Sequence, residues 1–340
     1  MQLGKLTSHQ LHRLLEQFPR PGAEVIMGPK IGEDAAIIDY GDKVLVAKTD
    51  PITFATDMIG WYAVNINAND IACCGAKPRW FLATLLLPQH ILEDEIQRIF
   101  DQMIQATESL DVTIIGGHTE ITDQVSQPIV IGTMLGEALK SKYVITSGAL
   151  PGDSIVLTQS LAIEGTAILA SESSKALLNK HVSLKNIEKC KSLLVNPGIS
   201  VVQAALLANE IANIHSMHDP TEGGLATALY ELAHAANVGV LIYKHKLPIL
   251  DETTSVCEAL CLDPLGLLAS GTLLITLDQN QVPKLLKALD SISVPACEIG
   301  TITSEKDGVL ISTSMNTSSI PKFERDELAR FFEEQHLNNW

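Results

Sequence analysis

Acidic residues beside glycines, between residues 32 and 120, are the part of this chain best suited to chemistry. Carboxylates that converge raise each other's pKa, and a divalent cation among them relieves the repulsion. Oxygen ligands of this kind favour Mg²⁺, which proteins usually share with substrate phosphates. The alternative is a set of separate, solvated turn acids, and the order of four such motifs argues against it. The motifs are Gly32-Glu33-Asp34-Ala35-Ala36, Thr49-Asp50, Asn67-Ala68-Asn69-Asp70 and Gly116-Gly117-His118-Thr119-Glu120.

A second candidate motif, His218-Asp219-Pro220-Thr221-Glu222-Gly223-Gly224-Leu225, lies in the other half of the chain. Thr221 suits the N-cap of a following helix, and Glu222 in the first turn favours the helix dipole. A capped helix does not explain Gly223 and Gly224, because each glycine costs a helix about 1 kcal/mol. A bare helix N-terminus is also an anion site. We therefore expect a ligand or another backbone to approach these glycines closely.

Several other function classes lack their motifs. The sequence contains no G-x-x-x-x-G-K-[ST] loop, no G-x-G-x-x-G fingerprint and no G-x-S-x-G elbow. His215 and His218 are spaced i, i+3 without an H-E-x-x-H pattern, so local hydrogen bonding is favoured over zinc. The six cysteines form no C-x-x-C pair and are expected to be reduced thiols.

The net charge and the hydropathy of the chain limit the kinds of partner that it is expected to bind. The net charge is −16, from 24 basic and 40 acidic residues, and basic runs that would bind a nucleic acid are missing. The first residues predict no signal peptide, and no apolar stretch of about 18 residues predicts a membrane span. We expect a cytoplasmic protein that binds neither nucleic acid nor membrane.

The elements that must position these motifs follow from periodicity and turn residues. Tyr40-Gly41-Asp42 predicts a hairpin turn, and Gly75 a helix C-cap. The segment 112–115 reads as a buried strand running into Gly116-Gly117, and 313–322 reads as a flexible linker. Helices are predicted over 7–18, 57–74, 92–110, 163–172, 184–194, 198–212, 221–236, 282–289 and 323–335, and strands over 36–39, 43–48, 80–87, 129–139, 154–158, 214–217, 238–243, 273–277, 295–302 and 309–312.

A chain of 340 residues is long enough for two domains. Thr146-Ser147-Gly148 to Pro151-Gly152-Asp153 is rich in turn residues, and a new strand follows. We place the boundary near residue 140, giving domains 1–140 and 141–340. Each half mixes adjacent strands with helices, so the predicted fold class is α+β in two lobes.

These motifs, in this order, resemble the superfamily of AIR synthase (PurM), thiamine-monophosphate kinase, selenophosphate synthetase and the hydrogenase maturation factor HypE. The resemblance covers roughly residues 25 to 312. Gly32 to Ala36 resembles its G-[DE]-D-A-A motif, Thr49-Asp50 its T-D element, and Asn69 to Pro78 its N-D-x-A-x-x-G-A-x-P motif. Met217 to Thr227 is most similar to the D-P-T-x-G-G-L-A stretch of the HypE branch.

The resemblance implies a PurM-like architecture, in which two N-terminal lobes pair into a dimeric barrel-like core beside a C-terminal α/β sandwich lobe. It also implies ATP and Mg²⁺ as cofactors. Asp34, Asp50 and Asp70 would hold metal, with Glu120 as a further carboxylate. Thr49, Asn69, Gly116, Gly117, Thr119, Gly223 and Gly224 would contact the nucleotide, and Asp219, Glu222 and His118 would act in catalysis.

Two departures from the superfamily pattern bear on the reaction. The fourth motif carries His118 where the kinase branch has Asp and AIR synthases have Glu, and neutral imidazole is a poor Mg²⁺ ligand. HypE proteins that make thiocyanate end in a cysteine, whereas the last cysteine here is Cys297 and the chain ends His336-Leu337-Asn338-Asn339-Trp340. No cysteine in the Gly-rich N-terminal segment suits selenophosphate synthesis.

The leading hypothesis is an Mg²⁺-ATP-dependent enzyme, HypE-like and AIR synthase-related, that transfers or cleaves the γ-phosphate. Its phosphoryl acceptor would be an amide or carbonyl-type oxygen of a small or protein-borne substrate. One alternative is a kinase for a small phosphorylated metabolite, of the thiamine-monophosphate kinase type. The other is a non-catalytic ATP-binding maturation or scaffold dimer. A homodimer is expected, and a maturation partner protein is a further candidate.

Overall fold

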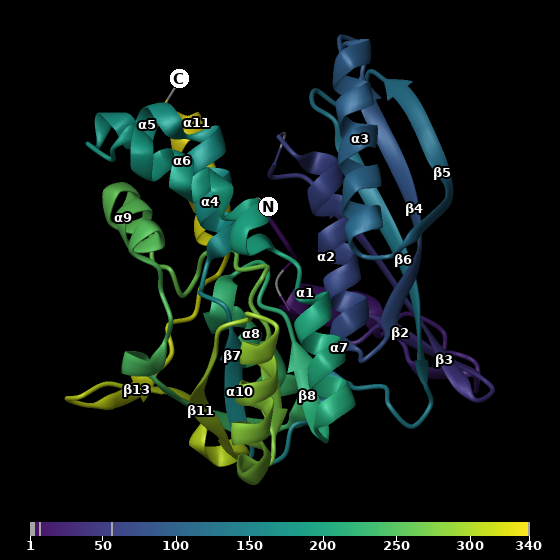
Figure 1. The fold of residues 1–340 in the computed structure, drawn as a ribbon, viewed down its shortest axis with the longest axis vertical. Coiled ribbons are helices and arrows are strands. Elements are labelled where there is room, and N and C mark those ends of the chain that lie inside the picture. The colour runs from purple at the N-terminus through teal and green to yellow at the C-terminus, as the bar shows by residue number, and fades with distance from the viewer. Residues whose placement is uncertain (1–3, 7, 56, 339–340) are drawn as a thin grey trace. The chain divides into compact units, whose positions relative to one another are not determined.

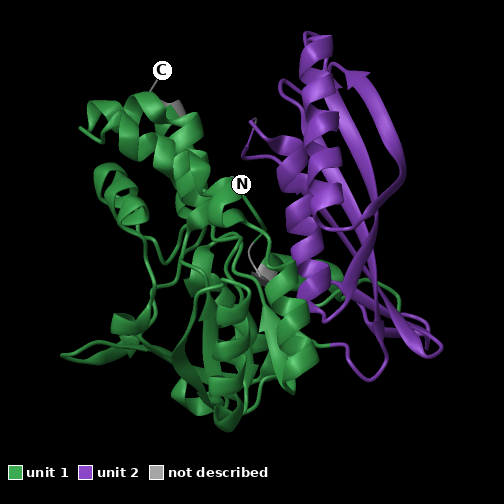
Figure 2. Cartoon of the chain, in the orientation of Figure 1, with its two compact units in different colours: residues 1–20, 29–33, 144–340 green, residues 21–28, 34–143 purple. Residues whose placement is uncertain are grey.

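The computed structural model describes residues 4–6, 8–55 and 57–338, and in it the chain forms two compact units (Figure 1, Figure 2). Unit 2 comprises residues 21–28 and 34–143, and unit 1 comprises 1–20, 29–33 and 144–340. Unit 1 therefore takes up the chain from Val144 onward, close to the predicted boundary near residue 140. It also takes up residues 1–20 and 29–33, which the predicted domains 1–140 and 141–340 placed with the first half.

Unit 2 is one mixed sheet with two helices on one face (Figure 1). Neighbouring strands are antiparallel except β4 and β5, which are parallel. Alternate residues of β4 are buried against the helices, as Phe81, Ala83 and Leu85 show. The strands lie in the order β1 (Val25–Met27), β2 (Ala36–Tyr40), β3 (Lys43–Ile52), β6 (Ile129–Leu139), β4 (Lys77–Pro88) and β5 (Thr113–Thr122), and the helices are α2 (Ile59–Cys73) and α3 (Glu93–Ser109).

The two helices of unit 2 pack closely because of their sequences. In α3, Ile99, Met103 and Ala106 recur at helical spacing and are buried. Three acids occupy its first turn, and Glu95 accepts the Leu92 N–H at 2.9 Å, which completes the cap. A side chain at Gly60 of α2 would overlap the backbone of α3, so this glycine allows the helices to touch.

Unit 1 holds a seven-stranded sheet against which α7, α8 and α10 pack, with α4, α5, α6 and α9 grouped together. Neighbouring strands are antiparallel except β9 and β12. The sheet order is β13 (Thr317–Ser319), β12 (Val309–Ser312), β9 (Val238–Tyr243), β11 (Ala296–Ser304), β7 (Ser154–Thr158), β10 (Leu274–Leu277) and β8 (Ile214–His218). The helices are α1 (Ser8–Leu15), α4 (Ile163–Glu172), α5 (Ser174–Asn179), α6 (Leu184–Ser192), α7 (Val202–Ile211), α8 (Gly224–Ala236), α9 (Asp251–Leu260), α10 (Val282–Ser291) and α11 (Glu327–Asn338).

The two mixed sheets with their helices confirm the predicted α+β class. Most predicted elements are present with bounds shifted by a few residues, and the predicted helix over 7–18 begins at a residue outside the described ones. Three expectations were wrong. The strand from 112 is not buried and does not end at the glycines, because β5 runs through Gly116 and Gly117 and is exposed from Thr113 to Ile121. The linker 313–322 contains β13, paired with β12. Helices α5 and α9 and strand β1 were not predicted.

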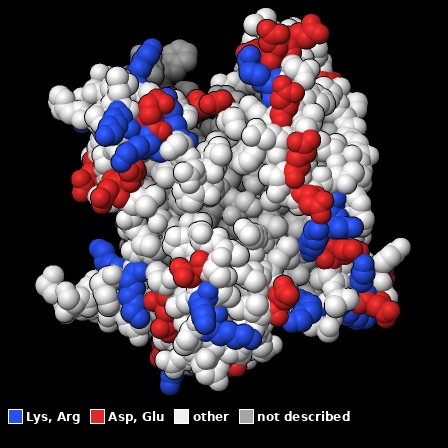
Figure 3. Space-filling view, viewed as in Figure 1, with Lys and Arg blue, Asp and Glu red and all other residues white. Residues whose placement is uncertain are grey.

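One segment, Leu184–Ile211, is long and apolar enough in composition to match a membrane span, and 44% of its most apolar window is buried. It consists of α6 and α7, and Asn196 between them has the non-helical angles φ −137° and ψ 106°. The apolar residues of this segment include Ile187, Cys190 and Ala205, which are buried in unit 1. Figure 3 shows basic side chains interspersed with acidic ones over the face in view.

Candidate active site

Two acids of unit 2 share one lysine. The Nζ atom of Lys48 lies 3.3 Å from Asp50 Oδ2 and 3.3 Å from Asp70 Oδ2. Lys48 and Asp50 are two residues apart on β3, so their side chains leave the same face of the sheet, and Asp70 lies on α2, which covers that face. The Asp70 side chain is only 6% exposed. A positive charge between these carboxylates offsets their mutual repulsion and favours their ionised form.

Asn67 fixes the strand that carries Asp50. Its Oδ1 accepts the Asp50 N–H at 2.9 Å, and its Nδ2 donates to Ala63 O at 2.8 Å and to Asp50 O at 3.3 Å. A side chain at Gly132, the β6 partner of Asp50, would overlap this amide. Neither Lys48 nor Asn67 was predicted as a site residue. Asn67 stands one helical turn before Asp70 in the same motif, and that spacing is the signal for it.

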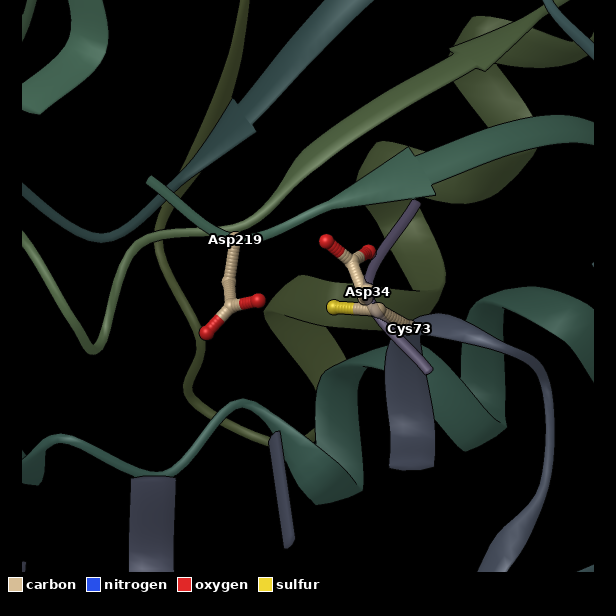
Figure 4. A group of neighbouring side chains, drawn as sticks. All are labelled: Asp34, Cys73 and Asp219. Carbon is tan, nitrogen blue, oxygen red and sulfur yellow. The ribbon is translucent and has the colours of Figure 1, made fainter. Parts of the chain in front are cut away.

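Asp34 and Cys73 are neighbours in the same unit (Figure 4). A carboxylate oxygen of Asp34 and the Sγ of Cys73 lie within 4.8 Å of each other, and both residues are buried. Figure 4 also draws Asp219, which belongs to unit 1. Cys73 follows Asp70 by three residues on α2, while Asn69 beside Asp70 is fully buried. All six cysteines are free thiols, as the sequence predicted.

The donor set of unit 2 fits a hard divalent cation. Asp34, Asp50 and Asp70 offer carboxylate oxygens, the ligand type that Mg²⁺ prefers. The ammonium of Lys48 already occupies a position between two of them, which shows that this pair of acids accommodates a cation. These residues are of a type that would hold such a metal, and a metal bound there would neutralise charge on phosphate oxygens.

The fourth motif lies elsewhere on the sheet. His118 Nε2 and Glu120 Oε2 are 3.6 Å apart on β5, with side chains 67% and 55% exposed. The register aligns Asp50 with Gly132, Ala83 and Gly117, so two strands separate β3 from β5, about 14 Å at ordinary strand spacing. His118 pairs with Thr84 on the sheet face opposite the helices. Within one chain, therefore, Glu120 does not join Asp50 and Asp70.

Packing explains other candidate positions of this sheet. A side chain at Gly117 would overlap the backbone of Ala83, and Gly117 has φ +153°. Gly116 has φ +154° and follows the irregularity in the pairing with β4. Thr49 Oγ1 donates to Gly132 O at 2.8 Å and accepts from Thr133 Oγ1 at 3.1 Å, and Thr119 is exposed on β5.

Glu33 has a structural role in unit 1. Its carboxylate accepts the backbone N–H groups of Thr146 at 2.9 Å and Ser147 at 3.2 Å, and its side chain is 3% exposed. These donors open the 3₁₀ turn Thr146–Gly148, whose first N–H groups have no partner within the turn itself. Glu33 and Asp34, adjacent in one motif, therefore belong to different units.

The motif from His218 to Leu225 forms a tight turn before α8. The predictions that Thr221 caps this helix and that Glu222 lies in its first turn were wrong: the N-cap is Gly223, both residues precede it, and Thr221 O accepts the Gly224 N–H at 2.9 Å. Gly223 and Gly224 have φ +81° and +61°, which favours glycine. A Cβ at Gly224 would lie 2.6 Å from Leu265 O. The approach expected at these glycines is made at Gly224 by another backbone.

Glu222 and the histidines in and beside this motif contact other side chains or backbone groups of unit 1. Asp219 is 2% exposed. Glu222 Oε2 accepts the Lys5 N–H at 3.2 Å, and Lys5 Nζ donates to Thr221 Oγ1 at 3.3 Å. His218 Nε2 lies 3.2 Å from Glu231 Oε2, and His215 Nδ1 lies 2.9 Å from Asp153 Oδ1. These contacts agree with local hydrogen bonding by both histidines.

Two buried acids of unit 1 were not predicted. The pKa of Glu164 is raised to about 7, chiefly by burial and also by the charges of Asp326 and Asp219, against hydrogen bonds from Ser270 that lower it. Burial also raises the pKa of Asp326 to about 7, with Glu222 adding to the rise and N–H donors such as Gly223 opposing it. Both acids lie far from the motif in sequence, so its spacing carries no signal for them.

Comparison with known proteins gives the same family over both units. Residues 32–138 match the model of the AIR synthase related protein, N-terminal domain, and residues 151–312 match that of the C-terminal domain. A putative hydrogenase expression/formation protein of Methanocaldococcus jannaschii is 31% identical over 289 residues, covering 83% of this chain and 82% of the relative. Carbamoyl dehydratase HypE of Rhodobacter capsulatus is 29% identical over 284 residues, covering 81% and 80%.

Solved structures share the fold. HypE in complex with ATP has a TM-score of 0.72 at 22% identity and covers 96% of this chain and 98% of its own. A HypE–HypF complex gives 0.72 at 23%, covering 86% and 93%. A thiamine-monophosphate kinase homologue named ThiL, complexed with AMPPCP and TMP, gives 0.70 at 21%, covering 93% and 94%. The fold is thus PurM-like, and the chain belongs to the AIR synthase-related family.

Proposed function

We propose that this protein is a HypE-like, Mg²⁺-ATP-dependent enzyme that transfers or cleaves the γ-phosphate of ATP. The acceptor would be an amide or carbonyl-type oxygen of a small or protein-borne substrate, which phosphorylation converts into a leaving group. The observation that carries the proposal is the pair Asp50 and Asp70, held around the Lys48 ammonium with Asp70 buried. The carbamoyl dehydratase relatives and the ATP complex of HypE support it.

The proposed roles follow the chemistry of each group. Asp34, Asp50 and Asp70 hold Mg²⁺, which neutralises phosphate charge. Asp219 and Glu222 act toward the transferred phosphoryl group. Such catalysis consists mainly of positioning and charge stabilisation. The remaining nucleotide contacts are proposed for Thr49, Asn69, Gly116, Gly117, Thr119, Gly223 and Gly224.

We propose that Cys297 does not take the carrier role of the cysteine in cysteine-terminated HypE proteins. Cys297 lies on β11, and its Sγ donates to Lys246 O at 3.5 Å. Burial raises the pKa of this thiol, which lowers its nucleophilic thiolate fraction at neutral pH. We propose that any protein-borne substrate is brought by a partner, and the HypE–HypF complex supports a maturation partner of that kind.

A homodimer is proposed on the uncovered face of the unit 2 sheet. On this face Leu82, Leu86, Ile131 and Leu135 are only partly buried, and β5 beside them pairs with β4 alone among the described strands. Apolar sheet faces and free strand edges are surfaces that proteins usually cover. Pairing of two copies here would also bury the exposed motif that carries His118 and Glu120. We propose that this dimer is located in the cytoplasm.

Calorimetric titration with ATP, with and without Mg²⁺, tests the proposal. We expect Mg²⁺-dependent binding by the wild type, and loss of that metal dependence in Asp50→Asn, because the substitution removes an anionic ligand. Asp42→Asn is the matched control, since Asp42 is exposed in the β2–β3 turn. Phosphate release would be measured on the same samples.

The outcomes separate the candidate functions. Binding with turnover that Asp50→Asn abolishes supports the enzyme. Tight binding without turnover on any amide or carbonyl substrate points to the ATP-binding scaffold. Transfer to a phosphorylated small metabolite points to a kinase of the thiamine-monophosphate type. A wild type that binds no ATP contradicts all three.

A further inference from the structure

The C-terminal segment reaches back to the Asp219–Gly224 motif through one carboxylate. Asp326 Oδ2 accepts the Gly223 N–H at 2.6 Å, and Asp326 Oδ1 accepts the Leu328 N–H at 2.7 Å. Asp326 is 4% exposed. The first bond joins residues 103 positions apart in sequence, whereas the second caps α11. One side chain therefore fixes both the start of the last helix and the turn before α8.

The same segment is fastened beside this contact. The Glu327 N–H donates to Gly266 O at 3.0 Å, and Glu327 Oε2 accepts the Asp263 N–H at 2.9 Å. Arg330 Nε donates to Glu327 Oε1 at 2.7 Å, and Arg330 Nη2 donates to Cys261 O at 3.0 Å. The segment thus lies against residues 261–266 through a backbone hydrogen bond and through hydrogen bonds of charged side chains, and the latter are the stronger kind.

Residues 263–267 in turn touch the first turn of α8. Leu265 O accepts the Ala226 N–H at 2.9 Å. A Cβ at Gly224 would approach both Leu265 O and Leu267 O, at 2.6 and 2.7 Å. Asp326 therefore contacts the motif itself, at Gly223, whereas Glu327 contacts only the loop that packs on Gly224.

Helix capping alone does not explain Asp326. Asn caps helices as well as Asp does, without a buried charge. Its amide, however, offers a single acceptor oxygen, whereas the N–H groups of Gly223 and Leu328 lie on different oxygens of Asp326, and the Leu268 backbone is a further hydrogen-bond partner. Burial raises the pKa of Asp326 to about 7, so the carboxylate is retained against a desolvation cost. A carboxylate supplies two acceptor oxygens here, one for the Leu328 N–H of α11 and one for the Gly223 N–H.

We propose that Asp326 is a positioning residue of the reaction. By holding the Gly223 amide, it sets the backbone that presents Asp219 and Glu222, so the C-terminal segment is a fixed part of the active centre. This inference rests on the proposed ATP-dependent activity. In this proposal residues 323–338 are held in place beside the motif and do not act as a mobile tail that carries substrate.

The test compares Asp326→Asn with Glu327→Gln in the full-length protein. Both variants neutralise a buried acid of the same segment, but Glu327 bonds the 263–266 loop and not the motif. We expect Asp326→Asn to lower kcat for Mg²⁺-ATP turnover at least ten-fold, with KM for ATP changed less than two-fold. Glu327→Gln should keep kcat within two-fold while lowering the melting temperature at least as much. Amide hydrogen exchange over residues 219–228 should accelerate in Asp326→Asn only.

Each other result contradicts the inference. Wild-type kcat in Asp326→Asn, or equal loss of kcat in both variants, would leave Asp326 a structural cap and overturn the positioning role alone. Unchanged exchange over 219–228 would show that the bond to Gly223 does not hold the turn. No turnover by the wild type would overturn the proposed function, and the positioning role with it.

Discussion

Glu33 and Asp34 are adjacent residues with different tasks. Glu33 accepts two backbone N–H groups at Thr146 and Ser147, whereas Asp34 is buried beside Cys73 in the other unit. Their adjacency in one motif marks both as acids near glycine but does not tell which way each side chain points. The same limit applies to Lys48, whose place between Asp50 and Asp70 depends on α2 covering β3. Spacing finds candidate ligands, and packing decides which of them meet.

Glu164 gives a residue-scale prediction for stability against pH. Its pKa is raised from 4.5 to about 7 in the folded state. Its contribution to the unfolding free energy is therefore full below about pH 4.5 and is lost as the pH rises through 7. A shift of this size corresponds to about 3 kcal/mol. Glu164→Gln keeps an acceptor for the Ser270 N–H, at 3.2 Å in the wild type, and cannot ionise.

The expected result is that the unfolding free energy of the wild type falls relative to Glu164→Gln between pH 4.5 and 8, by about 3 kcal/mol. Urea titrations at several pH values measure it. Glu210→Gln, at an exposed site on α7, is the control and should run parallel to the wild type. Parallel curves for Glu164→Gln would show that Glu164 is not protonated in the folded protein.

At the scale of elements, the hairpin β2–β3, the helix α3 and the strands β7, β9 and β12 could be predicted because their periodicity and turn residues are local. What could not be predicted depends on partners distant in sequence. Strand β13 forms by pairing with β12, and β5 is an exposed edge although its residues read as a buried strand. The start of α8 is set by Gly223, whose N–H is bonded by Asp326 and not by Thr221.

The exposed sheet face gives a prediction at this scale. Ile131→Lys places a charge in the middle of the proposed dimer surface, so we expect a monomer where the wild type is a dimer. Ile104→Lys, at a side chain 44% exposed on α3, is the matched control on the other side of unit 2 and should remain dimeric. Light scattering after size exclusion measures the mass, and circular dichroism checks folding. A dimeric, folded Ile131→Lys would place the dimer contact elsewhere.

At the scale of the whole molecule, ligand binding should raise the free energy of unfolding and with it the melting temperature. A ligand that binds only the folded state, at about 100 times its Kd, stabilises by about 2.7 kcal/mol. We expect Mg²⁺-ATP to raise the melting temperature by several degrees, and EDTA to abolish the rise because the metal is removed. Asp70→Asn should show little rise with or without EDTA. An equal rise in EDTA would show that ATP binds without the carboxylate cluster.

The two-lobed α+β class was predictable at this scale, because residues 32–138 and 151–312 each carry their own family motifs and elements. The assignment of residues 1–20 and 29–33 was not. Lys5, which bonds Glu222 and Thr221, and Glu33, which bonds Thr146 and Ser147, tie these short segments to unit 1. Such ties join residues more than a hundred positions apart, and no local pattern reports them.

The chain's path through its two units has a consequence for synthesis. Unit 2 is complete once residue 143 has been made, whereas unit 1 contains both the first residues and the last. Domains generally fold in order of synthesis, so the N-terminal sheet is able to form on the ribosome while its companion waits. The turn at Gly223 lacks Asp326 until the C-terminal segment emerges. A nascent or truncated chain therefore carries its acidic sheet cluster early, but acquires the finished Gly223 turn only after Asp326 has been made.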